Sequence, residues 1–440
     1  MSLGKYVPAT TAEQQLMLAS MGMKSVEELY VSVPKELRID ELNIPKAKSE
    51  FEVRKVMTDI AAKNNVFTSI FRGAGAYHHY IPALVKQIAA KEEFLTAYTP
   101  YQAEISQGVL QAIFEFQTMI TELTGMASAN ASVYDGATAA AEAVNMTIDR
   151  KRKKVLIGAT VNPMTIQTVK TYCEGADVEM TIVPAKDGLT DLAALATLLD
   201  KETACLFIQQ PNYFGQIEPA EAIGELVHER QSKYIMGVNP LAVTVLKSPA
   251  ESGADIVTGE AQPLGLPLAY GGPYLGFMAT TEKLTRSLPG RIAGETVDAN
   301  GERAFVLTLQ AREQHIRREK AASNICSNQA HCALTASIYL TTMGPHGVKE
   351  AARQSYSKTH YLAQELTKIA GFELKHSGPY FHEFLATSPI APHLLMAKLE
   401  EHGILGGYPI GEDILWCATE MNTKEQIDQL VAVVKEVTVK

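Results

Sequence analysis

The chain has 440 residues, a formal net charge of −9, 46% hydrophobic residues and 20% charged residues, which is typical of a globular protein. This length predicts two or three domains, and it allows a core that needs no disulfide or metal for stability. The acidic balance argues against nucleic acid as the main partner.

The first part of the chain, residues 1–60, is predicted to form a helical arm. It resembles neither a signal peptide nor a transit peptide, and the five cysteines of the chain form no CxxC pair. We therefore expect a cytoplasmic protein without a zinc site. Further along, a helix is predicted by apolar residues at helical spacing, at Ile105, Val109, Ile113, Phe116, Ile120 and Leu123. Gly125 is expected to end it, and a second helix is predicted to begin at Ala137.

From Lys154 onward, short apolar runs alternate with amphipathic stretches. The predicted strands are Val155–Ala159, Val178–Val183, Ala204–Ile208, Tyr234–Val238 and Asp255–Thr258. This alternation predicts an α/β domain with a mostly parallel, doubly wound sheet, whose ligands lie beyond the carboxyl ends of the strands. The uncharged run 261–281 contains three prolines, so we interpret it as a loop and a buried strand, and expect no membrane association.

The last part of the chain has a different order of elements. Arg312 to Met343 is predicted to be one long helix that begins with a basic cluster and ends at Gly344-Pro345. Beyond it, helices alternate with strands at Phe372–Lys375, 381–386 and 414–418, which predicts a small α+β domain. The predicted division is therefore an arm at 1–60, a large α/β domain at 61–343 and a small domain at 344–440.

Three motifs have both a structural and a functional interpretation. The stretch Asp135 to Thr138 opens a helix, where it either binds an anion at the free N–H groups or forms a simple turn and cap. The basic cluster that begins at Arg312 is either a solvated face or a docking site for an acidic partner or a phosphate. His78 and His79 lack the spacing of metal ligands, so we expect no metal.

The segment Asp255–Pro263 carries the most information. It is similar to the lysine-bearing strand of pyridoxal-phosphate (PLP) enzymes of the aspartate-aminotransferase fold (type I), whose Schiff-base Lys follows an Asp by eight residues and is preceded by His. Here Pro263 stands at the Lys position and Gln262 at the His position. Asn239 stands where the family usually has the Asp that holds the pyridine nitrogen protonated. The resemblance thus implies the fold, with a seven-stranded type of large sheet, but without its cofactor anchors.

Over nearly its whole length the chain resembles the P-proteins of the glycine cleavage system, and specifically the first (α-type) subunit of split glycine decarboxylases. The matching segments, in chain order, are 71–77 (FRGAGAY), 98–108 (YTPYQAEISQG), 129–132, 134–142 (YDGATAAAE), 289–291 (PGR), 312–319 (REQHIRRE) and 324–326. His78, Asn239 and His331 depart from the family pattern.

The resemblance implies a subunit that lacks PLP and acts with a partner. Together with a Lys-bearing β-type subunit (glycine dehydrogenase subunit 2), such a chain decarboxylates glycine with PLP held by the partner. The aminomethyl group then passes to the lipoate of the H-protein. The assembly implied is α2β2. The alternative is a non-catalytic scaffold that only stabilises the partner and docks the H-protein.

The resemblance also implies which residues matter. A contribution to the partner's site is expected from Tyr98, Thr99, Tyr101, Gly271 and Gly272, although the two tyrosines could equally only pack the interface. A vestigial anion cup is expected at Asp135, Gly136, Ala137 and Thr138. Contacts to the substrate carboxylate or the lipoyl arm, or else purely structural roles, are expected for Arg291, Arg312 and His315.

Overall fold

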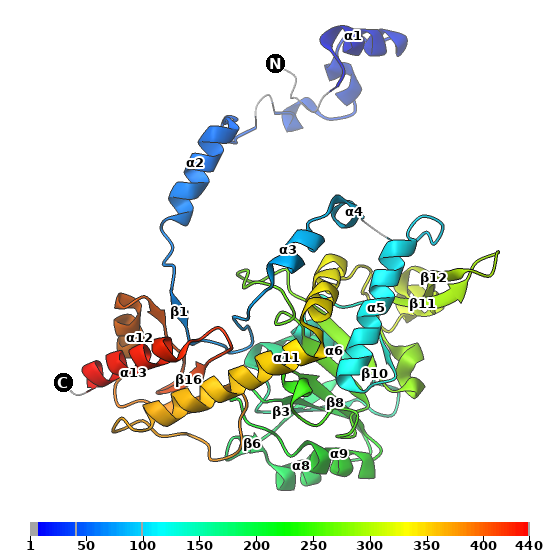
Figure 1. Cartoon of the computed structure of the whole chain (residues 1–440). Helices are drawn as coiled ribbons and strands as arrows, with labels where there is room; N and C mark the ends of the chain where they lie inside the picture. The colour runs from blue at the N-terminus through cyan, green and yellow to red at the C-terminus, as the bar shows by residue number, and fades with distance from the viewer. Residues whose placement is uncertain (1–7, 40–41, 98–99, 439–440) are drawn as a thin grey trace. The chain divides into compact units, whose positions relative to one another are not determined.

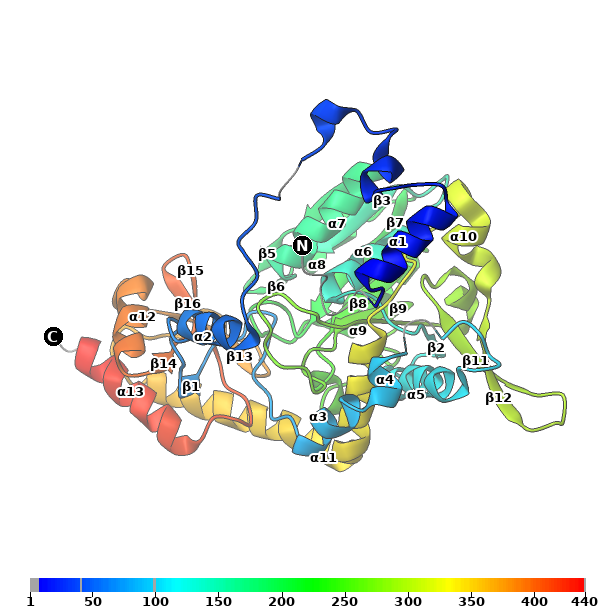
Figure 2. The same cartoon turned by 90° about the horizontal axis from the view of Figure 1, so that it is seen from above.

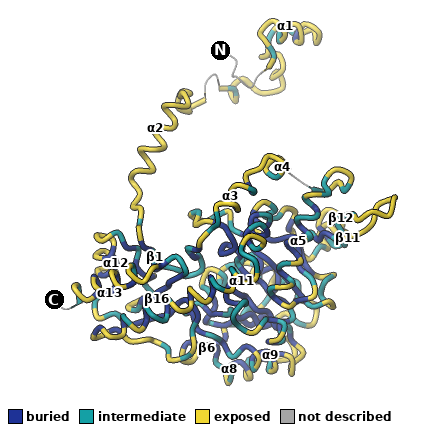
Figure 3. The backbone as a smooth tube through the Cα atoms, in the orientation of Figure 1, coloured by how far each residue is buried: buried dark blue, intermediate teal, exposed yellow. Residues whose placement is uncertain are grey.

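The computed structural model describes residues 8–39, 42–97 and 100–438, and it divides the chain into two units, residues 1–65 and 66–440. The first unit consists of short helices, as predicted: α1 (Thr11–Ser20), η1 (Val26–Tyr30), η2 (Lys35–Leu37) and α2 (Glu50–Ala61). Capping boxes at Thr10 and Ser49 begin its two α-helices. Leu18 is the one buried residue among those described in this unit, which is almost entirely exposed in Figure 3.

A seven-stranded sheet forms the centre of the second unit (Figure 1). Its order is β2 (Ser128–Ala129), β10 (Gly276–Thr280), β9 (Ile256–Glu260), β8 (Lys233–Val238), β7 (Thr203–Gln210), β3 (Lys154–Gly158) and β4 (Glu179–Val183). The five strands from β9 to β4 pair in parallel, whereas β10 runs antiparallel to β9 and β2. The mostly parallel sheet predicted from the alternating pattern is confirmed.

Helices cover both faces of this sheet, as Figure 1 and Figure 2 show together. The helices of this part of the chain are α3 (Ala83–Ala89), α4 (Glu92–Leu95), α5 (Gln107–Thr124), α6 (Gly136–Asn145), α7 (Pro163–Gly175), α8 (Leu192–Leu198) and α9 (Ala220–Glu229), of which α3 and α4 lie away from the sheet. Along β7, Cys205 and Phe207 pack with α6 and α7, while Leu206 and Ile208 pack on the opposite face. The strand is buried on both faces, which explains its continuous apolar sequence.

The remaining elements complete the second unit. Small hairpins are formed by β5 (Ala185–Lys186) with β6 (Leu189–Thr190) and by β11 (Ile292–Val297) with β12 (Arg303–Thr308). The C-terminal part contains β13 (Glu383–Thr387), α12 (Pro392–Glu401), β14 (Ile404–Leu405), β15 (Tyr408–Ile410), β16 (Asp413–Cys417) and α13 (Lys424–Thr438). It has its own apolar core, to which Phe71 from the segment after β1 (Ser69–Ile70) contributes.

The predicted helix from Arg312 to Met343 is wrong at its beginning. The long helix α11 is Ala330–Leu366, with a bend at Gly344, and before it lie only η5 (Gln310–Arg312), α10 (Gln314–Arg317) and η6 (Arg318–Lys320). Arg318 has a φ of 56°, which a right-handed helix does not allow, so the helix cannot pass through it.

The strand predicted at Phe372–Lys375 is also wrong. Only Leu374 forms an isolated bridge, to Ala386, while Phe372 is buried in the C-terminal core. Its apolar character reflects that packing and not a strand. No helix in the described part of the chain is both long and apolar enough to cross a bilayer.

Candidate functional site

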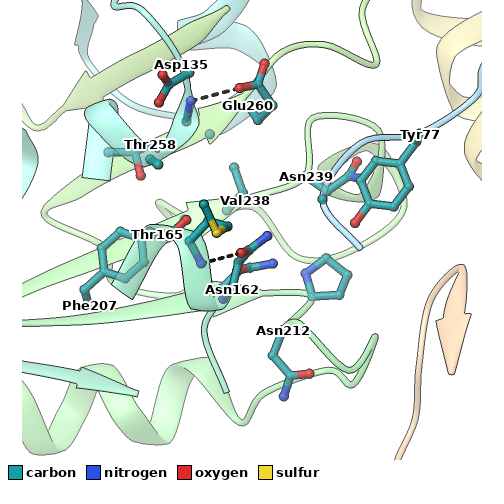
Figure 4. Close-up of a pocket in the computed structure, with 18 of the residues that line it drawn as sticks. Tyr77, Asp135, Asn162, Thr165, Phe207, Asn212, Val238, Asn239, Thr258 and Glu260 are labelled. Carbon is teal, nitrogen blue, oxygen red and sulfur yellow. Dashed lines mark hydrogen bonds between the residues drawn. The ribbon is translucent and has the colours of Figure 1, made fainter. Parts of the chain in front are cut away.

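A cavity of about 200 Å³ lies at the carboxyl ends of β8 and β9, where the sheet topology predicts a ligand site. Its wall is built from several parts of the second unit, among them these strand ends, the carboxyl end of β7, the beginnings of α6 and α7, the segment around Tyr77, and the start of β13. Figure 4 shows the labelled side chains around it. The lining includes Tyr77, Asp135, Gly136, Asn239, Glu260, His382 and Glu383.

The anion cup at Asp135, Gly136, Ala137 and Thr138 exists as a helix N-terminus, but carboxylates already fill it. Asp135 caps α6 by accepting a 2.7 Å hydrogen bond from the Thr138 N–H. Glu260 accepts a 2.9 Å bond from the Gly136 N–H, drawn as a dashed line in Figure 4. The other oxygen of Glu260 accepts bonds from Gln262 and Leu275 N–H groups, at 2.9 and 3.1 Å.

Glu260 therefore takes the place that an incoming anion would need. Gly136 lies so close to Glu260 that a Cβ added at Gly136 would be 2.8 Å from the Cβ of Glu260. Burial raises the pKa of Glu260 to about 7, against the lowering effect of its three N–H donors. A phosphate would meet two carboxylates at this helix end instead of free N–H groups.

The residues at the positions of the cofactor lysine and its neighbour have structural roles. Pro263 is buried and offers no amine, because its nitrogen belongs to the backbone amide. Gln262 is 1% exposed and connects two loops. Its Oε1 accepts from the Tyr77 N–H at 2.9 Å, and its Nε2 donates to the carbonyls of Tyr77 at 2.9 Å and Leu266 at 2.8 Å.

Replacing Gln262 by alanine is expected to destabilise the chain by about 3 kcal/mol, because it leaves buried backbone groups of Tyr77 and Leu266 without partners. Urea unfolding of the two proteins measures the change. The matched control is Gln354→Ala, since Gln354 is exposed and bonds only to Glu350 on its own helix. That control should cost less than about 0.5 kcal/mol. An equal loss of unfolding free energy in the two variants would contradict a stabilising role of the buried hydrogen bonds of Gln262.

Asn239 is bound in a way that does not fit a protonated pyridine. Its Oδ1 accepts from the N–H groups of Leu241 at 2.9 Å and Ala242 at 3.2 Å, and its Nδ2 lies 3.4 Å from His382 Nε2. A neutral amide cannot supply the negative charge that stabilises a pyridinium. Together with Pro263 and Glu260, this means that the residues of this chain do not fit PLP.

A second group of predicted residues comes together away from the cavity, at the loop before β11 and the segment before α10. The guanidinium of Arg291 lies over the ring of Tyr101, 3.6 Å from its centroid, and its Nε is 3.7 Å from a carboxylate oxygen of Glu313. His315 Nδ1 is 3.7 Å from the same carboxylate. Arg291 and Glu313 are largely buried, while Tyr101 is 40% exposed. We call Tyr101, Arg291, Glu313 and His315 the Arg291 cluster.

The side chain of Arg312 lies next to this cluster and makes its hydrogen bonds to the loop before β11. Its guanidinium donates to the carbonyls of Leu288 and Gly290, and burial lowers its pKa from the usual value. These contacts fix the loop that carries Arg291. The predicted contact of Arg312 with the substrate carboxylate or the lipoyl arm stays a prediction.

The glycine turn is exposed, and the aromatic segment is only partly described. Gly271 and Gly272 have φ values of 105° and 126°, which glycine adopts without strain, and the neighbouring Tyr270 is fully exposed. Tyr98 and Thr99 lie outside the described residues, so their predicted role remains a prediction.

The sequence reasoning missed Glu260, Glu313, His382 and Glu383. Glu260 is the last residue of the buried strand β9, and a charged residue directly after a buried run is a signal that was available. His382 and Glu383 stand within a predicted strand of the small domain, and only the fold brings them to the cavity. Glu383 is buried, accepts bonds from the Ala74 N–H at 2.6 Å and the Tyr77 hydroxyl at 2.7 Å, and has a pKa raised by burial to about 7.

Comparison with known proteins agrees with these features. The family model described as glycine cleavage system P-protein matches residues 4–434. Relatives named "Probable glycine dehydrogenase (decarboxylating) subunit 1" from Desulfitobacterium hafniense and Moorella thermoacetica are each 49% identical, over 98% of this chain and 99% of theirs. The Bacillus subtilis relative of the same name is 48% identical, over 97% of this chain and 98% of its own.

Solved structures agree as well. A crystal structure of glycine decarboxylase (P-protein) of the glycine cleavage system, in inhibitor-bound form, has a TM-score of 0.94 and 39% identity, covering 99% of this chain and 100% of that chain. A sphingosine-1-phosphate lyase from Burkholderia pseudomallei (TM-score 0.68, 12% identity, 93% and 94% covered) and a cysteine desulfurase from Thermococcus onnurineus (0.64, 14%, 90% and 100%) share the fold alone. The predicted type I fold of PLP-dependent enzymes is thus confirmed, and the chain belongs to the glycine cleavage system P-protein family.

Proposed function

We propose that this chain is the subunit of a glycine decarboxylase that does not bind PLP. A Lys-bearing β-type partner, glycine dehydrogenase subunit 2, would hold PLP, and the complex would decarboxylate glycine and transfer the aminomethyl group to the lipoate of the H-protein. The observation that carries the proposal is Pro263 at the lysine position beside an anion cup filled by Glu260, in a chain that matches relatives named subunit 1 end to end.

In this proposal the chain completes the partner's site with surface groups. The turn at Gly271 and Gly272 offers the backbone N–H of the exposed Gly271 to an anion held by the partner, while the Gly272 N–H donates to the Ala269 carbonyl at 3.2 Å. Tyr101 offers a hydroxyl and an aromatic face, and Arg291 and Glu313 fix its ring. The scaffold alternative assigns these groups only to packing, and Arg291 variants distinguish the two interpretations.

The exposed apolar side chains of the first unit support the proposal of a permanent partner. Large apolar side chains are exposed throughout it, among them Val31 at 82% and Phe51 at 78%. Such a density of exposed apolar groups is typical of an interaction surface. We propose that the β-type subunit covers them, and that two such pairs associate as α2β2 in the cytoplasm.

Reconstitution tests the proposal. The isolated chain, supplied with PLP, glycine and lipoylated H-protein, is expected to release no CO₂ above background. Addition of the β-type subunit should give glycine-dependent CO₂ release that saturates at one copy of each subunit. Decarboxylation by this chain alone would refute the proposal, as would full activity of the β-type subunit without it.

A further inference from the structure

The proposed function assigns no role to the cavity at the carboxyl ends of β8 and β9, although polar side chains line it. Its volume of about 200 Å³ is enough for a ligand of a few heavy atoms, and polar groups from several separate parts of the second unit line its wall. Three of these groups are carboxylates, those of Asp135, Glu260 and Glu383. No Lys or Arg occurs among the described residues that line it.

Among the described residues, no Lys, Arg or His forms an ion pair with any of the three carboxylates. Glu260 and Glu383 accept hydrogen bonds from neutral N–H and O–H groups only, and no ion pair to either is found among the described residues. Burial raises the pKa of both to about 7, which shows that the surroundings do not compensate the ionised forms. A cation in the cavity would provide the missing charge.

His382 provides a second and independent indication of a ligand. It is 2% exposed, lines the cavity, and has no hydrogen-bond partner for Nδ1 among the described residues. Because Asn239 Oδ1 accepts two N–H groups, its Nδ2 is the group near His382 Nε2 and donates to it. Burial lowers the pKa of His382 well below the usual value, so the neutral ring carries its proton on Nδ1. This buried donor is available to an oxygen atom.

From this arrangement we infer that the cavity binds a small protonated primary amine that also carries a hydrogen-bonding oxygen. Its ammonium group is held by the carboxylate of Glu383, and its oxygen by polar groups of the wall. Anions are rejected, because each of the three charged side chains in the wall is negative. The inference concerns this chain alone and does not depend on the activity of a complex with a partner.

Calorimetric titration of the full chain at pH 7.5 tests the inference with three probes of similar size. Ethanolamine is a cation with a hydroxyl, ethylene glycol replaces its ammonium by a second hydroxyl, and glycine has a carboxylate in place of its hydroxymethyl group. We expect saturable 1:1 binding of ethanolamine, with the other two at least tenfold weaker. Equal binding of all three probes, no saturable binding of ethanolamine, or saturable binding of inorganic phosphate in the cavity would overturn the inference.

Two variants that remove charge locate the binding site. Glu383→Gln should weaken ethanolamine binding at least tenfold, because it removes the carboxylate that holds the ammonium group. Asp135→Asn should weaken it several-fold, because the charge is lost while the amide oxygen still accepts from the Thr138 N–H. Glu229→Gln, on the exposed surface of α9, is the matched control and should change nothing. If Glu383→Gln does not fold, the Asp135→Asn variant decides, and an unchanged or stronger affinity there contradicts the inference.

Discussion

Replacing Arg291 by alanine is expected to lower the glycine-dependent CO₂ release of the reconstituted complex about 100-fold while leaving the complex assembled. The guanidinium lies 3.6 Å from the centroid of the Tyr101 ring and pairs with the buried Glu313. Without it, the half-exposed Tyr101 ring loses this contact and its position shifts. A displacement of about 1 Å of a positioning group can cost a factor of about 100 in rate.

A matched control exists on the neighbouring hairpin. Arg303 also lies over an aromatic ring, that of Phe305 at 4.9 Å, and also pairs with a glutamate, Glu295. Arg303→Ala should therefore remove the same kinds of contact outside the Arg291 cluster and leave turnover within about twofold. Arg291→Lys should recover part of the activity, because an ammonium still pairs with Glu313. Full activity of the Arg291→Ala complex would favour the scaffold alternative.

Removal of residues 1–65 is expected to abolish stable association with the β-type subunit. This unit has one buried residue, Leu18, among those described, and its apolar side chains need another surface to be buried. The second unit contains all of the large apolar clusters, so the truncated chain should keep its fold. Sedimentation velocity of the mixed subunits measures the association, and circular dichroism checks the fold.

A point variant separates apolar contact from loss of chain length. Phe51→Asp places a charge at an apolar position of α2 that is 78% exposed, and it should weaken association strongly. Lys55→Ala on the same helix removes an exposed side chain that pairs only with Asp59, and it should have little effect. If the truncation instead lowers the melting temperature of the isolated chain and leaves association intact, the first unit stabilises this chain and not the complex.

Much of the fold could be predicted because local patterns and tertiary packing agree. The runs around β3, β7 and β8 are apolar on both faces, since helices cover both, and such runs are recognisable without a structure. The predicted cap at Asp135 is present for the same reason, because its bond to Thr138 is local. The beginning of α11 was not predictable in this way, since the positive φ of Arg318 has no signal in the sequence comparable to a glycine.

The candidate site was harder to predict because its contacts are long-range. Gly136 and Glu260 are 124 residues apart, and nothing in either segment indicates that the carboxylate of one fills the helix end of the other. The departures at Pro263 and Asn239 could be found by position, because the family pattern fixes their spacing. The pairing of Tyr101 with Arg291 could not, although both lie in segments that carry the family resemblance.

The most direct test of the account is to locate the pyridoxyl group. The purified chain is incubated with PLP, reduced with borohydride and weighed by mass spectrometry, first alone and then after addition of the β-type subunit. The account predicts no specific pyridoxyl adduct on this chain in either sample and one adduct on a lysine of the partner. A stoichiometric adduct on a single lysine of this chain would contradict it and would make that lysine the centre of a different mechanism.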